Sequence, residues 1–75
     1  MEILQYKIIF CLKKIRNSKG VTQPQLAKLS GISQSYISEI ENTLKTPTLD
    51  TIEKLANALQ VHPYEFQEVQ KIQVN

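Results

Sequence analysis

The sequence is poor in the residues that build disulfides, metal sites and most catalytic centres. Among its 75 residues there is one cysteine, Cys11, and one histidine, His62. A single cysteine forms no internal disulfide, which fits a reducing compartment, so a cytoplasmic protein is expected. One cysteine and one histidine supply neither a metal-ligand set nor a nucleophile–base pair. We therefore expect no metal, no cofactor and no enzymatic activity.

Long apolar runs are also missing. No stretch approaches the roughly 18 apolar residues of a membrane-spanning helix. The opening MEILQYKIIFCLKK has an acid before its apolar run and no small-residue cleavage site, so it is not expected to be a signal peptide. Neither membrane association nor a small-molecule ligand is expected. The length suits one small domain over residues 1–75, with a core at about 8–66 that is marginal in size and favours compact helices or oligomerisation.

Acidic residues are absent from almost half of the chain. Residues 3–38 contain no Asp or Glu, although the net charge of the whole chain is only +2. The same stretch carries the basic residues Lys7, Lys13, Lys14, Arg16, Lys19 and Lys28. This is either a solvated basic face or a surface that meets a polyanion, and charge alone leaves both interpretations open.

Apolar spacing and start signals predict five helices and an all-α fold. The first helix is expected from near Leu4 to about Asn17, with Gly20 as a left-handed cap after it. Its apolar stripe consists of Ile8, Cys11, Leu12 and Ile15.

The second and third helices have the clearest start signals. Thr22 and Gln25 have the spacing of a capping box, in which each side chain satisfies an amide of the other. Gly31 is expected to end the second helix. Ser33 is the expected N-cap of the third, which should end near Asn42.

The fourth and fifth helices follow a loop that ends at Pro47. Thr48 is expected to cap the fourth helix. His62 is expected at the cap of the fifth, with Pro63 at its first position and Glu65 at its third. The tail, residues 67–75, fits either a continuing helix or a short strand.

Three small or apolar residues relate the second helix to the third. Ala27 permits a close helix crossing, Gly31 can adopt the positive φ that a sharp turn needs, and Ile37 fills the angle between the helices. This spacing within two capped helices is typical of a helix-turn-helix over residues 22–42. The alternative is a helical hairpin that uses the same residues for packing alone.

The outward face of the third helix has an unusual composition. It carries Ser35, Ser38, Glu39 and Asn42, where a merely soluble helix usually has better helix formers such as Lys. Short polar side chains let a helix enter a DNA major groove about 12 Å wide and bond to base edges. Gln34 in the first turn can pair with adenine in bidentate fashion. Glu39 can accept from cytosine, repel wrong sequences, or be an ordinary exposed residue.

The chain resembles the Xre/Cro-type helix-turn-helix regulators of bacteria and phages. The resemblance covers about residues 8–66 and is carried by the order TQ…LA…GIS…YIS.IE…..P…T…LA.AL.V. It implies a five-helix, lambda-repressor-like domain that binds operator DNA, generally as a homodimer. Restriction–modification controller proteins are similar in size and also have YIS in the third helix.

The resemblance also implies roles for individual residues. DNA base contacts are implied for Gln34, Ser35, Ser38 and Glu39. Contacts with the DNA backbone are implied for Thr22, Gln23, Tyr36, Asn42, Lys45 and Thr46. For Tyr36, a place at the edge of the core is an alternative.

A structural ion pair is implied between Arg16 and Glu41, since an unpaired charge at the margin of the core would be costly. Arg16 as a phosphate contact is the alternative. The family often has Gly where this chain has Thr43, which leaves the geometry of the following loop open.

A homodimer is expected, because one recognition helix contacts too few base pairs to find an operator alone. The end of the chain has more apolar residues than a small core needs, and such a surplus often marks an interface. The interface candidates are Val61, Tyr64, Phe66, Val69 and Ile72. Alternatively, the N-terminal segment with Ile3, Leu4, Ile9 and Phe10 covers this surface within one chain.

These expectations together predict a sequence-specific, double-stranded DNA-binding transcriptional regulator, a repressor or controller protein. The alternative is an antitoxin or another protein-interaction module that also binds its own promoter. A tail over residues 67–75 that orders only on a partner would favour the alternative.

Overall fold

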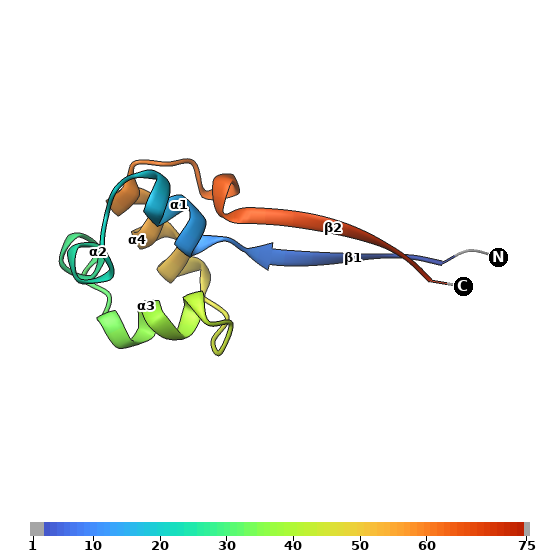
Figure 1. Ribbon diagram of the computed structural model, residues 1–75, viewed down its shortest axis with the longest axis horizontal. Helices are drawn as coiled ribbons and strands as arrows, with labels where there is room; N and C mark the ends of the chain where they lie inside the picture. Colours follow the sequence, from blue (N-terminus) through green and yellow to red (C-terminus); the bar gives the residue numbers. More distant parts are fainter. Residues whose placement is uncertain (1–2, 75) are drawn as a thin grey trace.

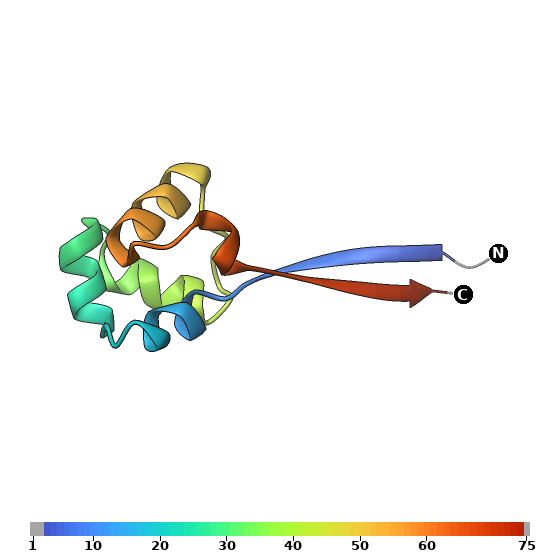
Figure 2. The same cartoon turned by 90° about the horizontal axis from the view of Figure 1, so that it is seen from above.

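A computed structural model describes residues 3–74 as a helical domain from which two paired strands project (Figure 1). The strands are β1, Ile3–Phe10, and β2, Gln67–Val74, and we call the pair the arm. Four α-helices lie between them in this part of the chain: α1 Leu12–Ser18, α2 Gln23–Ser30, α3 Gln34–Glu41 and α4 Leu49–Leu59. The molecule extends over 50 × 22 × 20 Å because the arm lies along its long axis, as the view from above shows (Figure 2).

The predicted starts of the middle helices are confirmed. Thr22 accepts a hydrogen bond from the amide of Gln25, whose side chain accepts one from the amide of Thr22, so the capping box is complete. Ser33 and Thr48 cap α3 and α4 in the same way, each accepting from the amide three residues later. These starts are predictable because each depends on a side chain and a backbone amide within one turn.

The expectation of a fifth helix is wrong. His62 caps this segment as predicted, and the Glu65 carboxylate accepts a hydrogen bond from the amide of His62. However, the helical segment is a single 3-10 turn, η1, Pro63–Phe66, and the chain then continues as β2. The tail thus adopts the strand alternative. Residues 67–74 pair within the chain, and Asn75 lies outside the described residues.

The expectation of a first helix from near Leu4 is also wrong, and with it the all-α class. Residues 3–10 form β1, which pairs antiparallel with β2 from Ile3 opposite Val74 to Phe10 opposite Gln67. The helix α1 begins only at Leu12. Ile8, expected in a buried stripe, is 65% exposed on the strand. Leu4, Tyr6, Ile8 and Phe10 alternate with a period of two, which is the strand signal that the helical spacing obscured.

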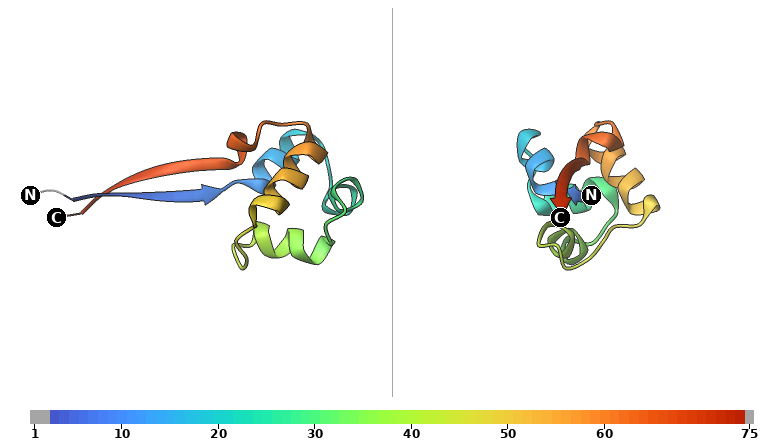
Figure 3. Two further views of the ribbon diagram at one scale, coloured as in Figure 1. Left: turned by 180° about the vertical axis from the view of Figure 1, so that it is seen from behind. Right: turned by 90° about the vertical axis from the view of Figure 1, so that its right-hand side faces the viewer.

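The core lies entirely within the helical domain and its flanking turn. Its buried hydrophobic residues are Leu12, Leu26, Ile32, Ile37, Ile40, Leu55, Ala56, Leu59 and Phe66. Phe66 is fully buried and packs on Phe10, with ring centroids 5.1 Å apart. Phe66 is therefore not available as a dimer contact, which corrects that expectation. Its burial closes the domain at the base of the arm. Figure 3 shows the arm leaving the helical domain, seen from behind and from the end.

Candidate nucleic-acid interface

The turn between α2 and α3 has the geometry that the spacing predicted. Gly31 has φ 75° and donates its amide to the carbonyl of Ala27 at 2.9 Å. Ser30 donates its hydroxyl to the carbonyl of Leu26 and accepts the amide of Ile32, which fixes both sides of the turn. Ile37 is fully buried between the helices. The direction of α3 relative to the core is therefore set by backbone conformation as well as by packing.

The outward face of α3 is polar and accessible. Gln34 and Ser35 are exposed, whereas Ser38 and Glu39 are half-buried. Gln34, Ser35 and Ser38 line an open hollow together with Gln23 at the start of α2. In Figure 1, α3 lies at the margin of the domain, with its long side free of other elements. The four lining side chains offer amide and hydroxyl groups, which can donate and accept hydrogen bonds without charge.

The expected backbone-contact residues border this face. Thr22 and Asn42 lie at opposite ends of the helix-turn-helix, as N-cap of α2 and C-cap of α3. Lys45 and Thr46 are exposed in the loop before α4. Tyr36 is half-buried and packs against the core, so its ring belongs to the edge of the core while part of it stays accessible.

Arg16 and Glu41 form a bidentate ion pair under this surface. The guanidinium Nε and Nη2 of Arg16 donate to the two carboxylate oxygens of Glu41 at 2.7 and 2.9 Å, and its Nη1 donates to the carbonyl of Val21 at 2.8 Å. The side chains are 9% and 3% exposed. Since each of these nitrogens is engaged inside the domain, the alternative role of Arg16 as a phosphate contact finds no support.

The ion pair controls the charge state of Glu41. Burial alone would raise the pKa of the Glu41 carboxyl, but hydrogen bonds from Arg16 and Gln23 outweigh it and hold this pKa below its ordinary value. The same contact raises the pKa of Arg16. Glu41 therefore remains ionised at neutral pH despite its burial.

Gln23 has a second role that the sequence did not reveal. Its amide nitrogen donates to Glu41 Oε1 at 3.0 Å. Gln23 thus contacts the buried ion pair and also lines the hollow on the outward face of α3. A contact between residues on different helices has no local signal, so sequence spacing could not have identified it.

Thr43 adopts the conformation for which the family often uses glycine. Its φ is 59°, in the left-handed region that β-branched residues rarely occupy. The turn is nevertheless formed, since the amides of Thr43 and Leu44 donate to the carbonyls of Ile40 and Glu39 at 3.1 and 2.8 Å. The loop geometry that the substitution left open is therefore retained, with strain at one residue.

Thr43→Gly is expected to raise the free energy of unfolding by about 1 kcal/mol, because glycine adopts a left-handed conformation without a steric penalty. Thr46→Gly, in the same loop but without a positive φ, is the matched control and should lower stability slightly. Urea denaturation of both variants measures the difference. Equal changes in the two variants would contradict strain at Thr43.

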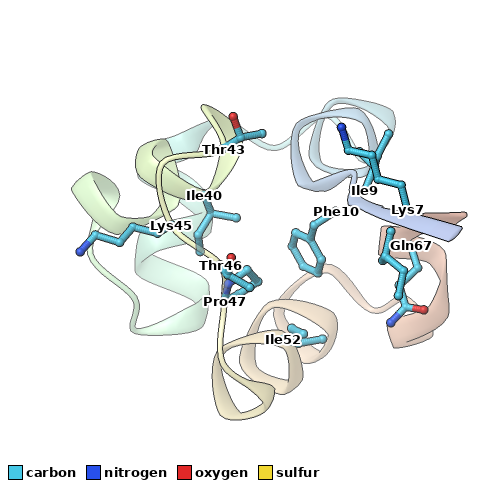
Figure 4. Close-up of a pocket in the computed structure, with 11 residues that line it drawn as sticks. Lys7, Ile9, Phe10, Ile40, Thr43, Lys45, Thr46, Pro47, Ile52 and Gln67 are labelled. Atoms are coloured by element: carbon cyan, nitrogen blue, oxygen red, sulfur yellow. The ribbon is translucent and has the colours of Figure 1, made fainter. Parts of the chain in front are cut away.

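A second hollow lies between the base of the arm and the loop before α4 (Figure 4). Its floor is apolar, formed by Phe10, Ile40, Pro47 and Ile52. Its lining also includes Lys7 to Ile9 from β1, Lys45 and the two threonines of the loop. We call this hollow the arm groove.

Within residues 3–74, no helix is both long and apolar enough to cross a membrane. The described part of the chain also holds no group of three or more His, Cys, Asp or Glu side chains that could bind a metal ion.

Comparison with known proteins finds a matching family and several similar proteins. A family model described as helix-turn-helix matches residues 12–66, which include the helices and η1 but neither strand of the arm. The HTH-type transcriptional regulator y4dJ of Sinorhizobium fredii is 40% identical over 53 residues, which cover 71% of this chain and 69% of that protein. The immunity repressor protein of Bacillus phage phi105 is 40% identical over 50 residues, but the match spans only 35% of its length.

A solved structure agrees with these similarities. The restriction–modification controller protein C.AhdI from Aeromonas hydrophila superimposes with a TM-score of 0.71 at 40% sequence identity. The superposition covers 73% of this chain and 83% of C.AhdI.

Proposed function

This chain belongs to the helix-turn-helix family whose model matches residues 12–66, and we propose that it is a sequence-specific DNA-binding transcriptional regulator with α3 as its recognition helix. The observation that carries this function is the polar face of α3, whose uncharged residues Gln34, Ser35 and Ser38 line one hollow together with Gln23 of α2. Such a surface can approach a base edge closely and bond to it. Several proteins similar to this chain are named as a transcriptional regulator, a repressor or a controller protein, which supports the same function.

We propose that base recognition depends mainly on the first turn of α3. Gln34 and Ser35 are exposed there, so a groove wall meets them first. Ser38 and Glu39 lie one turn later and are less accessible. Contacts with DNA phosphates are assigned to Thr22, Gln23, Tyr36, Asn42, Lys45 and Thr46, which border this face. These contacts would position α3 without specifying sequence.

The regulator is proposed to act as a homodimer whose two domains contact two half-sites in successive major grooves, about one helical turn apart. Occupancy of the operator would then block or recruit the polymerase. The DNA that it binds can be identified by selection from random duplexes with the full chain. Failure to enrich any sequence over several rounds would refute sequence-specific binding.

Gln34→Ala is expected to relax discrimination at one base position of the selected site. A bidentate contact contributes about 1–3 kcal/mol, so the preferred base should lose about fivefold to 150-fold of its advantage. Competition binding with each single-base variant of the site measures this loss. Gln70→Ala on the arm is the matched control and should leave the base preference unchanged. A uniform loss of affinity for all sequences would instead assign Gln34 to the phosphates.

A further inference from the structure

The arm exposes more apolar surface than an isolated ribbon can sustain. Its strands pair with each other, and both outer edges lack a strand neighbour in the described chain. Leu4, Tyr6 and Ile8 on β1 are 48%, 68% and 65% exposed, and Val69 and Ile72 on β2 are 59% and 40% exposed. A two-stranded sheet is marginally stable in water and gains stability from a third strand or a covering layer. The arm is therefore a sheet that would gain stability from a further strand at one of its open edges.

The two open edges differ in character. β1 carries a single charge, Lys7, among mostly apolar residues. β2 carries two charges, Glu68 and Lys71, and three glutamines. Charged and polar residues are the usual protection of an edge strand against pairing, and β1 has little of it. The free edge of β1 is thus the one suited to accept a further strand.

The residue order of β1 is complementary to itself. When two copies of the strand run antiparallel with Tyr6 opposite Tyr6, Leu4 of each copy faces Ile8 of the other on the same side of the sheet. Lys7 of each copy then faces Gln5, so like charges do not meet. We propose that a second copy of this chain pairs along β1 in this register, giving a four-stranded sheet in the order β2–β1–β1–β2.

The free edge of β2 offers fewer apolar pairs. With Val69 opposite Val69, Glu68 would face Gln70 and Gln67 would face Lys71, so this register forms one apolar pair in the dimer. With Gln70 opposite Gln70, Val69 would face Lys71 and Glu68 would face Ile72, which sets a charge against an apolar side chain each time. With Lys71 at the centre, the two ammonium groups would meet. The β1 register forms three pairs on one face, Tyr6 with Tyr6 and Leu4 with Ile8 twice, so the larger apolar contact favours a second copy of β1 as the occupant of the β1 edge.

The proposed register also reaches the helical domain. Ile9 forms part of the arm groove and stands opposite the strand end of the second copy at Ile3. In Figure 4 the β1 side chains Lys7 and Ile9 stand at one border of this groove. The two domains lie at opposite ends of the sheet, with their Phe10 Cα atoms about 27 Å apart at roughly 3.4 Å per residue.

This inference rests on the proposed function only for its biological use, namely the second recognition helix. The association itself requires no DNA, so it can be tested separately. If the arms associate but no DNA sequence is selected, the proposed function fails alone. If DNA is selected but the arms do not associate, the inference fails alone.

Charge exchange across the two-fold axis tests the register. Leu4→Glu alone and Ile8→Lys alone should each weaken dimerisation about tenfold or more, because each sets a charge against an apolar side chain twice per dimer. The double variant should recover most of the loss. The two positions are about 13 Å apart on one strand, so they can form a pair only between copies. Sedimentation equilibrium of the full chain gives the dissociation constants, and helical circular dichroism confirms that the domain stays folded.

Disulfide trapping identifies the edge. Both cysteine variants are made in a Cys11→Ser background and treated with oxidised glutathione. Tyr6→Cys should form a covalent dimer of the chain, whereas Gln70→Cys, at the centre of the β2 edge, should stay largely uncrosslinked over the same time. Three results would overturn the proposal: a wild-type chain that is monomeric at tens of micromolar, a double variant no better than the single ones, or preferential crosslinking through Gln70→Cys.

Discussion

Glu41→Ala is expected to destabilise the helical domain by about 3–5 kcal/mol, because it leaves Arg16 as an uncompensated charge in a site where its side chain is 9% exposed. The loss includes the hydrogen bond from Gln23 to the same carboxylate. Urea denaturation followed by helical circular dichroism measures the change. Glu53→Ala, which removes an exposed carboxylate from α4, is the matched control and should change stability by less than about 0.5 kcal/mol.

Replacement of both partners separates the effect of an unpaired charge on stability from the effect of lost side-chain volume. Arg16→Met combined with Glu41→Leu removes both charges and keeps apolar volume, so it should cost far less than Glu41→Ala. If the double replacement is as damaging as the single one, the ion pair is not the source of the loss. Equal effects of Glu41→Ala and Glu53→Ala would show that Glu41 behaves as a surface residue.

The dependence of the free energy of unfolding on pH in the acid range tests the same ion pair. The pKa of Glu41 is lower in the folded chain than in the unfolded chain, where it is about 4.3. As the pH falls through this range, the unfolded state binds the proton first, so stability decreases with decreasing pH. The stabilisation from Glu41 is thus complete above about pH 4.3 and is lost as the pH falls through the lower, folded pKa. The gap between wild type and Glu41→Ala should narrow accordingly.

The affinity for the selected operator is expected to fall steeply with salt. If each of two domains neutralises about three phosphates, six contacts predict a loss of about 10³ between 50 and 200 mM salt, because each contact releases condensed counterions. Lys45, exposed beside α3, is one expected contributor. Fluorescence anisotropy with a labelled operator gives the slope of log affinity against log salt.

Lys45→Ala should reduce that slope by about one per domain, without altering base preference. Lys54→Ala, on α4 and paired with Asp50, is the matched control and should leave the slope unchanged. An affinity that stays flat over this salt range would contradict DNA binding through the phosphates.

The helix-turn-helix was predictable from the sequence because its determinants are local. Capping side chains, Gly31 at the turn and Ile37 in the angle all act within one or two turns of the backbone, and the structure has each where the spacing predicted it. The polar face of α3 was predictable for the same reason, since helical periodicity alone assigns residues to the outer side of a helix. The sequence by itself thus determined the elements that form the candidate site.

Only the tertiary structure decided the two ends of the chain. Residues 3–10 and 67–74 each fit a helix as well as a strand, and the choice depends on hydrogen bonds between segments at opposite ends of the chain. Separation along the chain likewise conceals the packing of Phe66 on Phe10 and the hydrogen bond from Gln23 to Glu41. Local spacing carries no information about such pairs, because their free energy arises only when folding brings the segments together.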